Sequence, residues 1–160
     1  MDKKVSYKIA ISQLLSLADM ERMAGIAQPE YKYDLSRMTH LAEYLGLAEP
    51  PHFTVHIAGT KGKGSVASMI ASIIQDNGYS VGLYTSPHLH TFRERIRVNG
   101  VPISESLFAE SLGRVWSYIE HISCSEIDLP TTFEMLTSMA MDVFKHEQVD
   151  VAILEVGLGG

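Results

Sequence analysis

The sequence predicts an α/β fold, in which a mostly parallel β-sheet is flanked by helices. Three observations support this prediction. The hydrophobic pattern alternates along the chain between the short period of strands and the longer period of helices. An apolar segment that begins at Phe53 runs into a glycine-rich turn and then into a helical pattern at 66–74. The run from Val151 to Leu154 is continuously apolar, as expected of a strand that is covered on both faces.

The remaining elements follow in order along the chain. An amphipathic helix is predicted around 9–18, and a Gly/Pro-containing connector follows at 25–33. A second helix is predicted at 34–46, with Asp34 as its N-cap and Gly46 as its stop. The first helix has an apolar face that consists of Tyr7, Ile11, Leu14, Leu15 and Ala18. Further strands are predicted at 80–84, 92–98 and 149–156, and further helices at 104–122 and 132–146.

Composition restricts the class of protein. A chain of 160 residues that is 46% hydrophobic can bury a substantial core as one domain. The net charge of −6 argues against a nucleic-acid partner, because such proteins concentrate basic surface. A single cysteine, Cys124, cannot form an internal disulfide and favours a reducing, cytoplasmic location. No apolar stretch reaches the length of a membrane span.

The glycine-rich turn after the first strand has the features of a phosphate-binding loop. Glycines allow its N–H groups to point into one concavity, a lysine adds a positive charge, and the following helix directs its positive end at the same anion. The turn differs from the common G-x-x-x-x-G-K-[ST] pattern, because Ile57 replaces the first glycine and the hydroxyl residue comes one place later. The alternative is an ordinary strand-to-helix turn with an incidental lysine. The predicted nucleotide-binding residues are Gly59, Thr60, Lys61, Gly62, Lys63, Gly64 and Ser65, and the fold is therefore predicted to be like that of P-loop NTPases.

A carboxylate at the end of the last strand is the second candidate. Glu155 follows the apolar run and so lies at the carboxyl edge of a parallel sheet, where ligands bind. An acidic residue in this position commonly binds Mg²⁺ beside a phosphate loop. A solvated acid at a strand end is the alternative. The block Thr85-Ser86-Pro87-His88 follows the second strand, which places it at the same edge. Taken alone, this block would indicate an ordinary surface loop, because Ser-Pro commonly marks turns.

Two further segments carry polar residues. In 92–98, alternation predicts that Arg93, Arg95 and Arg97 share one strand face, either as a solvated basic face or as ligands of a substrate carboxylate. Asn99-Gly100 then signals a hairpin. Thr131 and Glu134 have the spacing of a capping box at a helix start. His88 and His90 are assigned to substrate contact or to loop packing, without a preference.

Four ordered blocks resemble one family. G-T-x-G-K-G-S, T-S-P-H-L, E-R-I-R-V-N-G and L-E-V-G-L-G-G, in this order, are similar to those of the folylpolyglutamate synthase and dihydrofolate synthase family, itself related to the Mur peptidoglycan ligases. The resemblance implies that Ser86 and Glu155 bind magnesium and that Thr131, Thr132, Phe133 and Glu134 bind the pteroate part of the substrate.

The resemblance implies an ATP-dependent ligase that adds L-glutamate to folate or dihydropteroate through an acyl phosphate, with Lys63 as the catalytic residue. A monomeric cytoplasmic enzyme is expected, with no nucleic-acid or membrane partner. We expect 1–160 to be the ATP-binding amino-terminal part of a longer enzyme, with a helical lead-in at 1–50 and an α/β core at 51–160 of the Mur-ligase central type. Without the carboxy-terminal domain it is expected to be inactive. A Mur-type amino acid ligase and a non-catalytic nucleotide-binding module are the alternatives.

Overall fold

The structure, a computed structural model, describes residues 6–23, 35–123 and 128–157. The chain divides into two compact units, one made of 1–49 and 105–139 and the other of 50–104 and 140–160. Cys124 lies outside the described residues. The expected division into a lead-in and a core stays a prediction, although residues 105–139 group with the first segment of the chain.

The first unit is helical. It contains α1 (Tyr7–Met23), α3 (Ser36–Tyr44), α5 (Glu105–Ile122) and the first half of α6 (Thr132–His146). Helix α1 packs on α5, and the rings of Tyr7 and Phe108 meet edge to face with centroids 5.3 Å apart. The buried side chains of α1 are Ala10, Leu14 and Leu17. The predicted face was therefore wrong at Leu15, which is 47% exposed. Spacings of three and four residues also describe a neighbouring row of residues on the helix surface, so the pattern alone did not decide which row is buried.

Helix α3 differs from its prediction at one end only. Its N-cap is Leu35, which makes no side-chain capping hydrogen bond, so the helix begins later than the predicted cap at Asp34, a residue outside the described ones. At the other end, Gly46 has φ 62° and donates its N–H to Glu43, while Leu47 donates to Ala42 at 2.7 Å. These are the two hydrogen bonds of a Schellman motif, so the predicted stop at Gly46 is confirmed.

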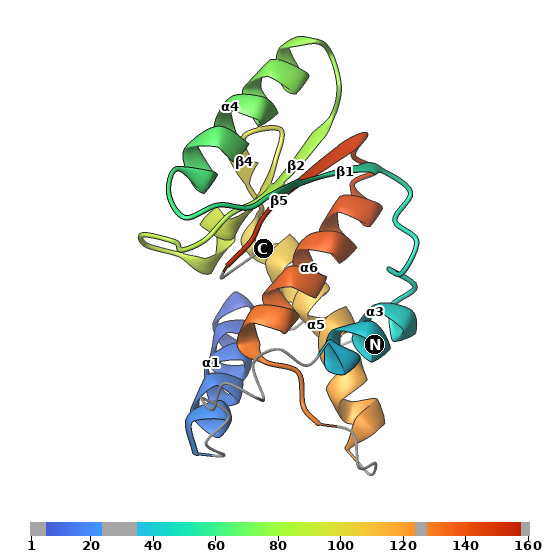
Figure 1. Cartoon of the computed structure of the whole chain (residues 1–160). Helices are drawn as coiled ribbons and strands as arrows, with labels where there is room; N and C mark the ends of the chain where they lie inside the picture. The colour runs from blue at the N-terminus through green and yellow to red at the C-terminus, as the bar shows by residue number, and fades with distance from the viewer. Residues whose placement is uncertain (1–5, 24–34, 124–127, 158–160) are drawn as a thin grey trace. The chain divides into compact units, whose positions relative to one another are not determined.

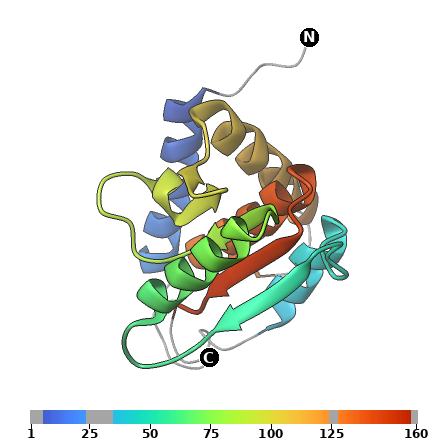
Figure 2. The same ribbon diagram turned by 90° about the horizontal axis from the view of Figure 1, so that it is seen from above.

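The second unit is built on a five-stranded sheet in the order β1-β5-β2-β3-β4. The three strands β1 (Phe53–Ile57), β5 (Val151–Glu155) and β2 (Val81–Tyr84) are parallel, and Figure 2 shows the β1 and β5 arrows side by side. Strands β3 (Ile96–Val98) and β4 (Val101–Pro102) add an antiparallel hairpin at one border, turned at Asn99 and Gly100. The predicted α/β fold is confirmed, as is the hairpin.

Helices cover both faces of this sheet. Helix α4 (Lys63–Asp76) lies along one face, as Figure 1 shows, and its small residues Ala67 and Ala71 pack on Val81, Leu83 and Ile153. The opposite face bears Gly82, and Phe144 of α6 lies so close to it that a Cβ there would stand 2.4 Å from the ring. Glycine therefore allows the helix to approach the strand closely.

The predicted strand over 92–98 was wrong in its first half. Residues Phe92–Arg95 form a short 3-10 helix, η1, and only Ile96–Val98 are extended. The cause is a local capping box, in which Thr91 accepts the N–H of Arg93 and the Glu94 carboxylate accepts the N–H of Thr91. Arg93 and Arg95 therefore do not share a strand face with Arg97.

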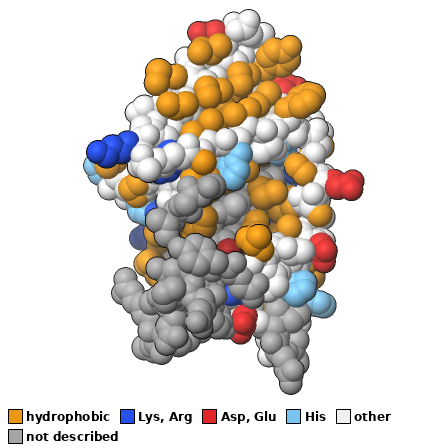
Figure 3. Space-filling view, viewed as in Figure 1, with side chains coloured by type: hydrophobic (Ala, Val, Ile, Leu, Met, Phe, Trp, Pro, Cys, Tyr) orange, Lys and Arg blue, Asp and Glu red, His pale blue; other side chains and the backbone are white. Residues whose placement is uncertain are grey.

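Part of the surface of the second unit is apolar. Figure 3 shows hydrophobic side chains gathered over α4, where Val66, Met69 and Ile73 are 41%, 59% and 63% exposed. Strand β1 lies at a border of the sheet, and its Phe53 is 82% exposed. Among the described residues, no second strand pairs with the outer side of β1. None of the described helices is long and apolar enough to cross a membrane.

Candidate functional site

The order of the strands places three chain segments at one edge of the sheet. Strand β5 lies between β1 and β2, with Ile57 opposite Glu155 and Tyr84 opposite Leu154. The carboxyl ends of these parallel strands therefore meet, and Glu155 lies between the loop that follows β1 and the loop that follows β2. This is the position in which open parallel sheets bind ligands.

The loop after β1 leads directly into helix α4, which begins at Lys63. Gly62 is the N-cap and has φ 74°, a left-handed conformation that glycine adopts without the penalty of a Cβ. The Lys63 ammonium lies back over the loop and donates to the carbonyl of Gly59 at 3.0 Å. The first turn of α4 carries no acidic residue of its own, so only groups from outside the helix can offset its positive end.

All seven predicted nucleotide-binding residues are thus in one loop and helix start. Lys63 and Gly64 are half-buried, and the other five are exposed and can be reached by a ligand. The turn has the strand, loop and helix context that a phosphate-binding loop requires. Its binding of a nucleotide stays a prediction.

Glu155 is brought together with both loops. Its side chain is 93% buried, with 7% of the residue exposed, and its Oε2 accepts the backbone N–H of Ser86 at 3.0 Å. On the other side, a Cβ at Gly64 would stand 3.5 Å from the same oxygen. The Glu155 carboxylate therefore lies in van der Waals reach of a side chain at position 64, where the common loop pattern has Ser or Thr.

The donor set at this edge fits magnesium better than softer metals. It consists of one carboxylate and the hydroxyl of Ser86, both hard oxygen ligands. Among the described residues there is no group of three or more His, Cys, Asp or Glu that could hold a metal. Mg²⁺ is commonly bound through one or two protein oxygens, together with water and phosphate oxygens, and does not need such a group.

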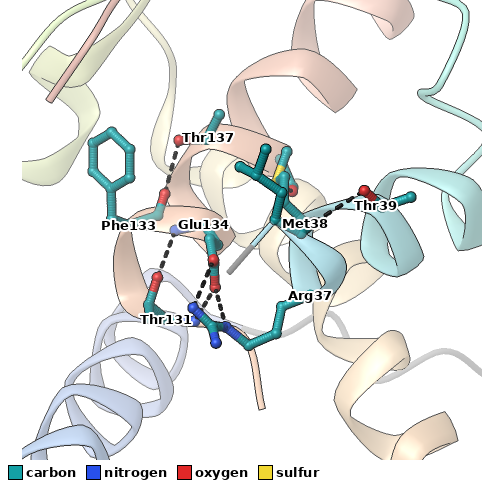
Figure 4. A network of polar contacts seen from close by, with 9 residues as sticks. Arg37, Met38, Thr39, Thr131, Phe133, Glu134 and Thr137 are labelled. Atoms are coloured by element: carbon teal, nitrogen blue, oxygen red, sulfur yellow. Dashed lines mark hydrogen bonds and ion pairs between the residues drawn. The ribbon is translucent and has the colours of Figure 1, made fainter. Parts of the chain in front are cut away.

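A second set of predicted residues lies in the helical unit. Thr131 and Glu134 form the predicted capping box: the Glu134 carboxylate accepts the N–H of Thr131 at 2.7 Å, and the Thr131 hydroxyl accepts the N–H of Glu134 at 3.2 Å. Figure 4 shows that Arg37 approaches the same carboxylate from α3. Its Nε donates to Oε2 at 3.2 Å and its Nη2 donates to Oε1 at 3.3 Å.

Sequence reasoning did not identify Arg37, although its side chain is only 2% exposed. It lies 97 residues from its partner, and no local pattern relates the two. The network fully engages Glu134 in structural contacts. The neighbouring Phe133 is 41% exposed, whereas Thr131, Thr132 and Glu134 are half-buried, so Phe133 is the most accessible member of the segment. Substrate binding by Thr131, Thr132, Phe133 and Glu134 stays a prediction.

The arginines and histidines after β2 contact one another. Arg95 Nε donates to His88 Nδ1 at 2.9 Å, and the His88 ring lies 4.3 Å from that of Phe92. Burial lowers the pKa of His88, and the nearby Arg95 charge lowers it further. These contacts favour loop packing for His88. The side chain of His90 is 88% exposed.

A hollow of about 790 Å³ lies at the opposite, amino-terminal end of the strands. It is lined by apolar side chains such as Phe53, Ile73 and Tyr79 and contains none of the predicted binding residues. The carboxyl edge is the better candidate for the site, because it brings the glycine-rich loop, Ser86 and Glu155 together where open parallel sheets bind ligands.

Known proteins are similar to this chain over most of its length. No family model matches the chain. It is 36% identical over 166 residues to a putative folylpolyglutamate synthase of Dictyostelium discoideum, a match that covers 99% of this chain and 26% of the relative. It is 42% identical over 130 residues to a dihydrofolate synthase/folylpolyglutamate synthase of Bacillus subtilis, covering 81% of this chain and 30% of the relative. The chain belongs to the folylpolyglutamate synthase and dihydrofolate synthase family.

Solved structures of folylpolyglutamate synthases (FPGS) have the same fold. An FPGS–AMPPCP–folate complex matches 97% of this chain with a TM-score of 0.83 and 32% identity, and the match covers 36% of that chain. The folylpolyglutamate synthase of Thermotoga maritima matches 88% of this chain with a TM-score of 0.75 and 42% identity. The chain therefore spans 26% to 36% of the lengths of these folylpolyglutamate synthase relatives.

Proposed function

We propose that the protein containing this chain is an ATP-dependent ligase that joins L-glutamate to a folate or a dihydropteroate. The observation that carries the proposal is the position of Glu155, which is held between the glycine-rich loop and Ser86. The family membership supports the choice of substrate, since one solved FPGS relative is a complex with AMPPCP and folate. The loop would bind the phosphates of ATP.

The proposed reaction has two steps. In the first, a carboxylate oxygen of the acceptor attacks the γ-phosphorus of ATP, the bond to the bridging oxygen breaks, and ADP leaves with that electron pair. In the second, the amine of glutamate attacks the acyl carbon of the acyl phosphate and loses a proton to water or a base. Inorganic phosphate then leaves with its bond electrons as the amide forms.

The residues of this chain would serve the first step. Lys63 and the N–H groups at the start of α4 would stabilise the charge that develops on the transferred phosphoryl group. This requires the Lys63 ammonium to exchange its 3.0 Å contact with the Gly59 carbonyl for phosphate oxygens. Ser86 and Glu155 would hold Mg²⁺, which when bound offsets the repulsion between the substrate carboxylate and ATP. Glu155 would also orient the loop after β2 through the N–H of Ser86.

A magnesium titration of ADP formation in the full-length protein tests the proposal. Activity should require both glutamate and a folate or dihydropteroate. Ser86→Ala and Glu155→Gln should each raise the magnesium concentration needed for half-maximal activity, and Glu155→Gln should be the worse change because it also removes a charge. The double variant should lose less than the sum of the two single losses, as residues acting as one unit do.

A control variant with the same change of charge is Glu147→Gln, at an exposed position after α6, which should behave as the wild type. Additive losses with an unaltered magnesium requirement would remove Ser86 and Glu155 from the metal site. ADP formation that does not depend on glutamate and on a folate or dihydropteroate would contradict the proposed ligase activity. The cytoplasmic location stays a prediction, since the relatives include mitochondrial enzymes such as that of Bos taurus.

A further inference from the structure

The loop after β2 is held from one side by the 3-10 helix η1. It comprises residues 85–91 and carries Ser86 as its second residue. At its start, the N–H of Thr85 donates to the carbonyl of Arg95 at 2.9 Å. In its middle, His88 accepts a hydrogen bond from the Arg95 side chain at 2.9 Å. The loop therefore has contacts with η1 at positions on both sides of Ser86.

The Glu94 carboxylate fixes the rest of the loop. Its Oε2 accepts the N–H of Leu89 at 2.9 Å, and its Oε1 accepts those of His90 at 3.0 Å and Thr91 at 2.9 Å. Only the contact with Thr91 belongs to the capping box of η1. The bonds to Leu89 and His90 go beyond what a cap requires and bind the carboxylate to the loop itself.

The hydrogen bonds from the loop lower the pKa of Glu94, because they favour its charged form. The N–H of Leu89 is the largest influence that lowers the pKa of Glu94, and those of Thr91 and His90 lower it further, against an opposing effect of desolvation. Ser86 itself is held from the other side, because its N–H donates to Glu155. Ser86 is bound to the candidate metal ligand, whereas five other residues of the loop are bound to η1: Thr85, His88, Leu89, His90 and Thr91.

We propose that Glu94 and Arg95 are positioning residues that hold the loop so that Ser86 stands ready beside Glu155 to bind a divalent cation. The inference rests on the proposed function, since it gives the E-R-I-R-V-N-G segment a task in that site. A loop that is already ordered loses less conformational entropy when the cation and the nucleotide bind. Neither residue needs to touch the cation, ATP or the acceptor.

The experiment compares magnesium requirements in the full-length protein. Glu94→Ala removes all three acceptor bonds, and Glu94→Gln retains one oxygen but loses the charge. Both should raise the half-saturating magnesium concentration for ADP formation, Glu94→Ala by roughly 10- to 100-fold, as expected when a group that orients a metal ligand is lost. The KM for ATP at saturating magnesium should stay within about twofold, because the phosphate loop is separate from η1.

A matched control lies in the same loop. Leu89 contributes its backbone N–H to Glu94, while the residue is 86% exposed. Leu89→Ala should therefore leave the magnesium requirement unchanged. Arg95→Met should raise it, and Arg95→Lys should restore it in part, because an ammonium can still donate to the His88 ring.

Different outcomes separate this inference from the proposed function. If Ser86→Ala raises the magnesium requirement but Glu94→Ala, Glu94→Gln and Arg95→Met only lower the melting temperature, the positioning role is refuted and the metal site stands. If Ser86→Ala has no effect on the magnesium requirement, the metal site of the proposed function fails and the inference fails with it. If Glu94→Ala does not fold, Glu94→Gln and Arg95→Met decide the result. A double variant Ser86→Ala/Glu94→Gln should be no worse than Ser86→Ala, and full additivity would show that Glu94 does not act through Ser86.

Discussion

Removing one member of the pair between Arg37 and Glu134 should strongly destabilise the helical unit. The Arg37 side chain is 2% exposed and that of Glu134 is 13% exposed, so neither charge can regain full hydration when its partner is lost. Breaking a buried pair in this way costs about 3–5 kcal/mol, whereas an exposed pair contributes about 0.2–1 kcal/mol. The structure therefore predicts that Arg37→Met and Glu134→Gln each lower the free energy of unfolding by about 3–5 kcal/mol, the range for a buried pair.

The substitution Glu134→Gln removes the charge of the side chain but keeps a group that can cap the helix. Glutamine can also occupy the third position of a capping box, so its side chain can still accept the N–H of Thr131. The double variant Arg37→Met/Glu134→Gln removes both charges and leaves no uncompensated ion. It should recover most of the lost free energy, because replacing a whole buried pair by neutral groups is often close to neutral.

Urea unfolding followed by tryptophan fluorescence measures these free energies. Trp116 is the one tryptophan of the 160-residue sequence and lies in α5, in the same unit as the pair. In thermal unfolding, a loss of about 3–5 kcal/mol corresponds to a fall of roughly 6–20 °C in Tm for a protein of this size. Single losses below about 1 kcal/mol, with no coupling in the double variant, would refute the view that burial makes this pair critical.

Three other expectations concern the sheet unit. Lys63→Ala should lower kcat of the full-length protein by at least roughly 100-fold, as the loss of a group that stabilises transition-state charge does, and unchanged ADP formation would exclude the loop as the phosphate site. Gly82→Ala should destabilise by about 1–3 kcal/mol in urea unfolding, because its Cβ would stand 2.4 Å from the Phe144 ring. Gly113→Ala, in a helix with no atom within 4 Å of the added carbon, is the control and should stabilise by up to about 1 kcal/mol. Burial lowers the pKa of His52 below its ordinary 6.5, so the unfolded chain binds the proton more readily. The free energy of unfolding should therefore have its full value above about pH 6.5 and should fall as the pH drops below it. If His52→Leu shows an equally steep fall with pH, His52 is not its cause.

Local patterns allowed much of the sheet unit to be predicted from the sequence. Helix α6 has the predicted bounds, because a clear hydrophobic period and strong boundary residues coincide there. The positions of Ser86 and Glu155 followed from one rule, that the ends of parallel strands share an edge. Their 3.0 Å hydrogen bond is consistent with that rule.

Other features depended on contacts that the local pattern does not contain. The ion pair of Arg37 joins residues 97 positions apart, and no periodicity indicates it. The error at 92–95 had a readable cause, since Thr91 and Glu94 have the same spacing as Thr131 and Glu134. The alternation of arginines favoured a strand, but the capping box determined the conformation.

Among the described residues, no strand pairs with the outer side of β1, and this border bears on how the protein should behave in concentrated solution. An unpaired strand presents alternating donors and acceptors to any chain that meets it, and the exposed ring of Phe53 makes such an encounter last longer. The extent of self-association through this border would increase with protein concentration. Light scattering should therefore rise more steeply than linearly with concentration. Thr54→Lys, at an exposed position on β1, places a charge on the border and should suppress the rise. A scattering curve that does not respond to this change would place the source of association elsewhere, for example on the apolar surface of α4.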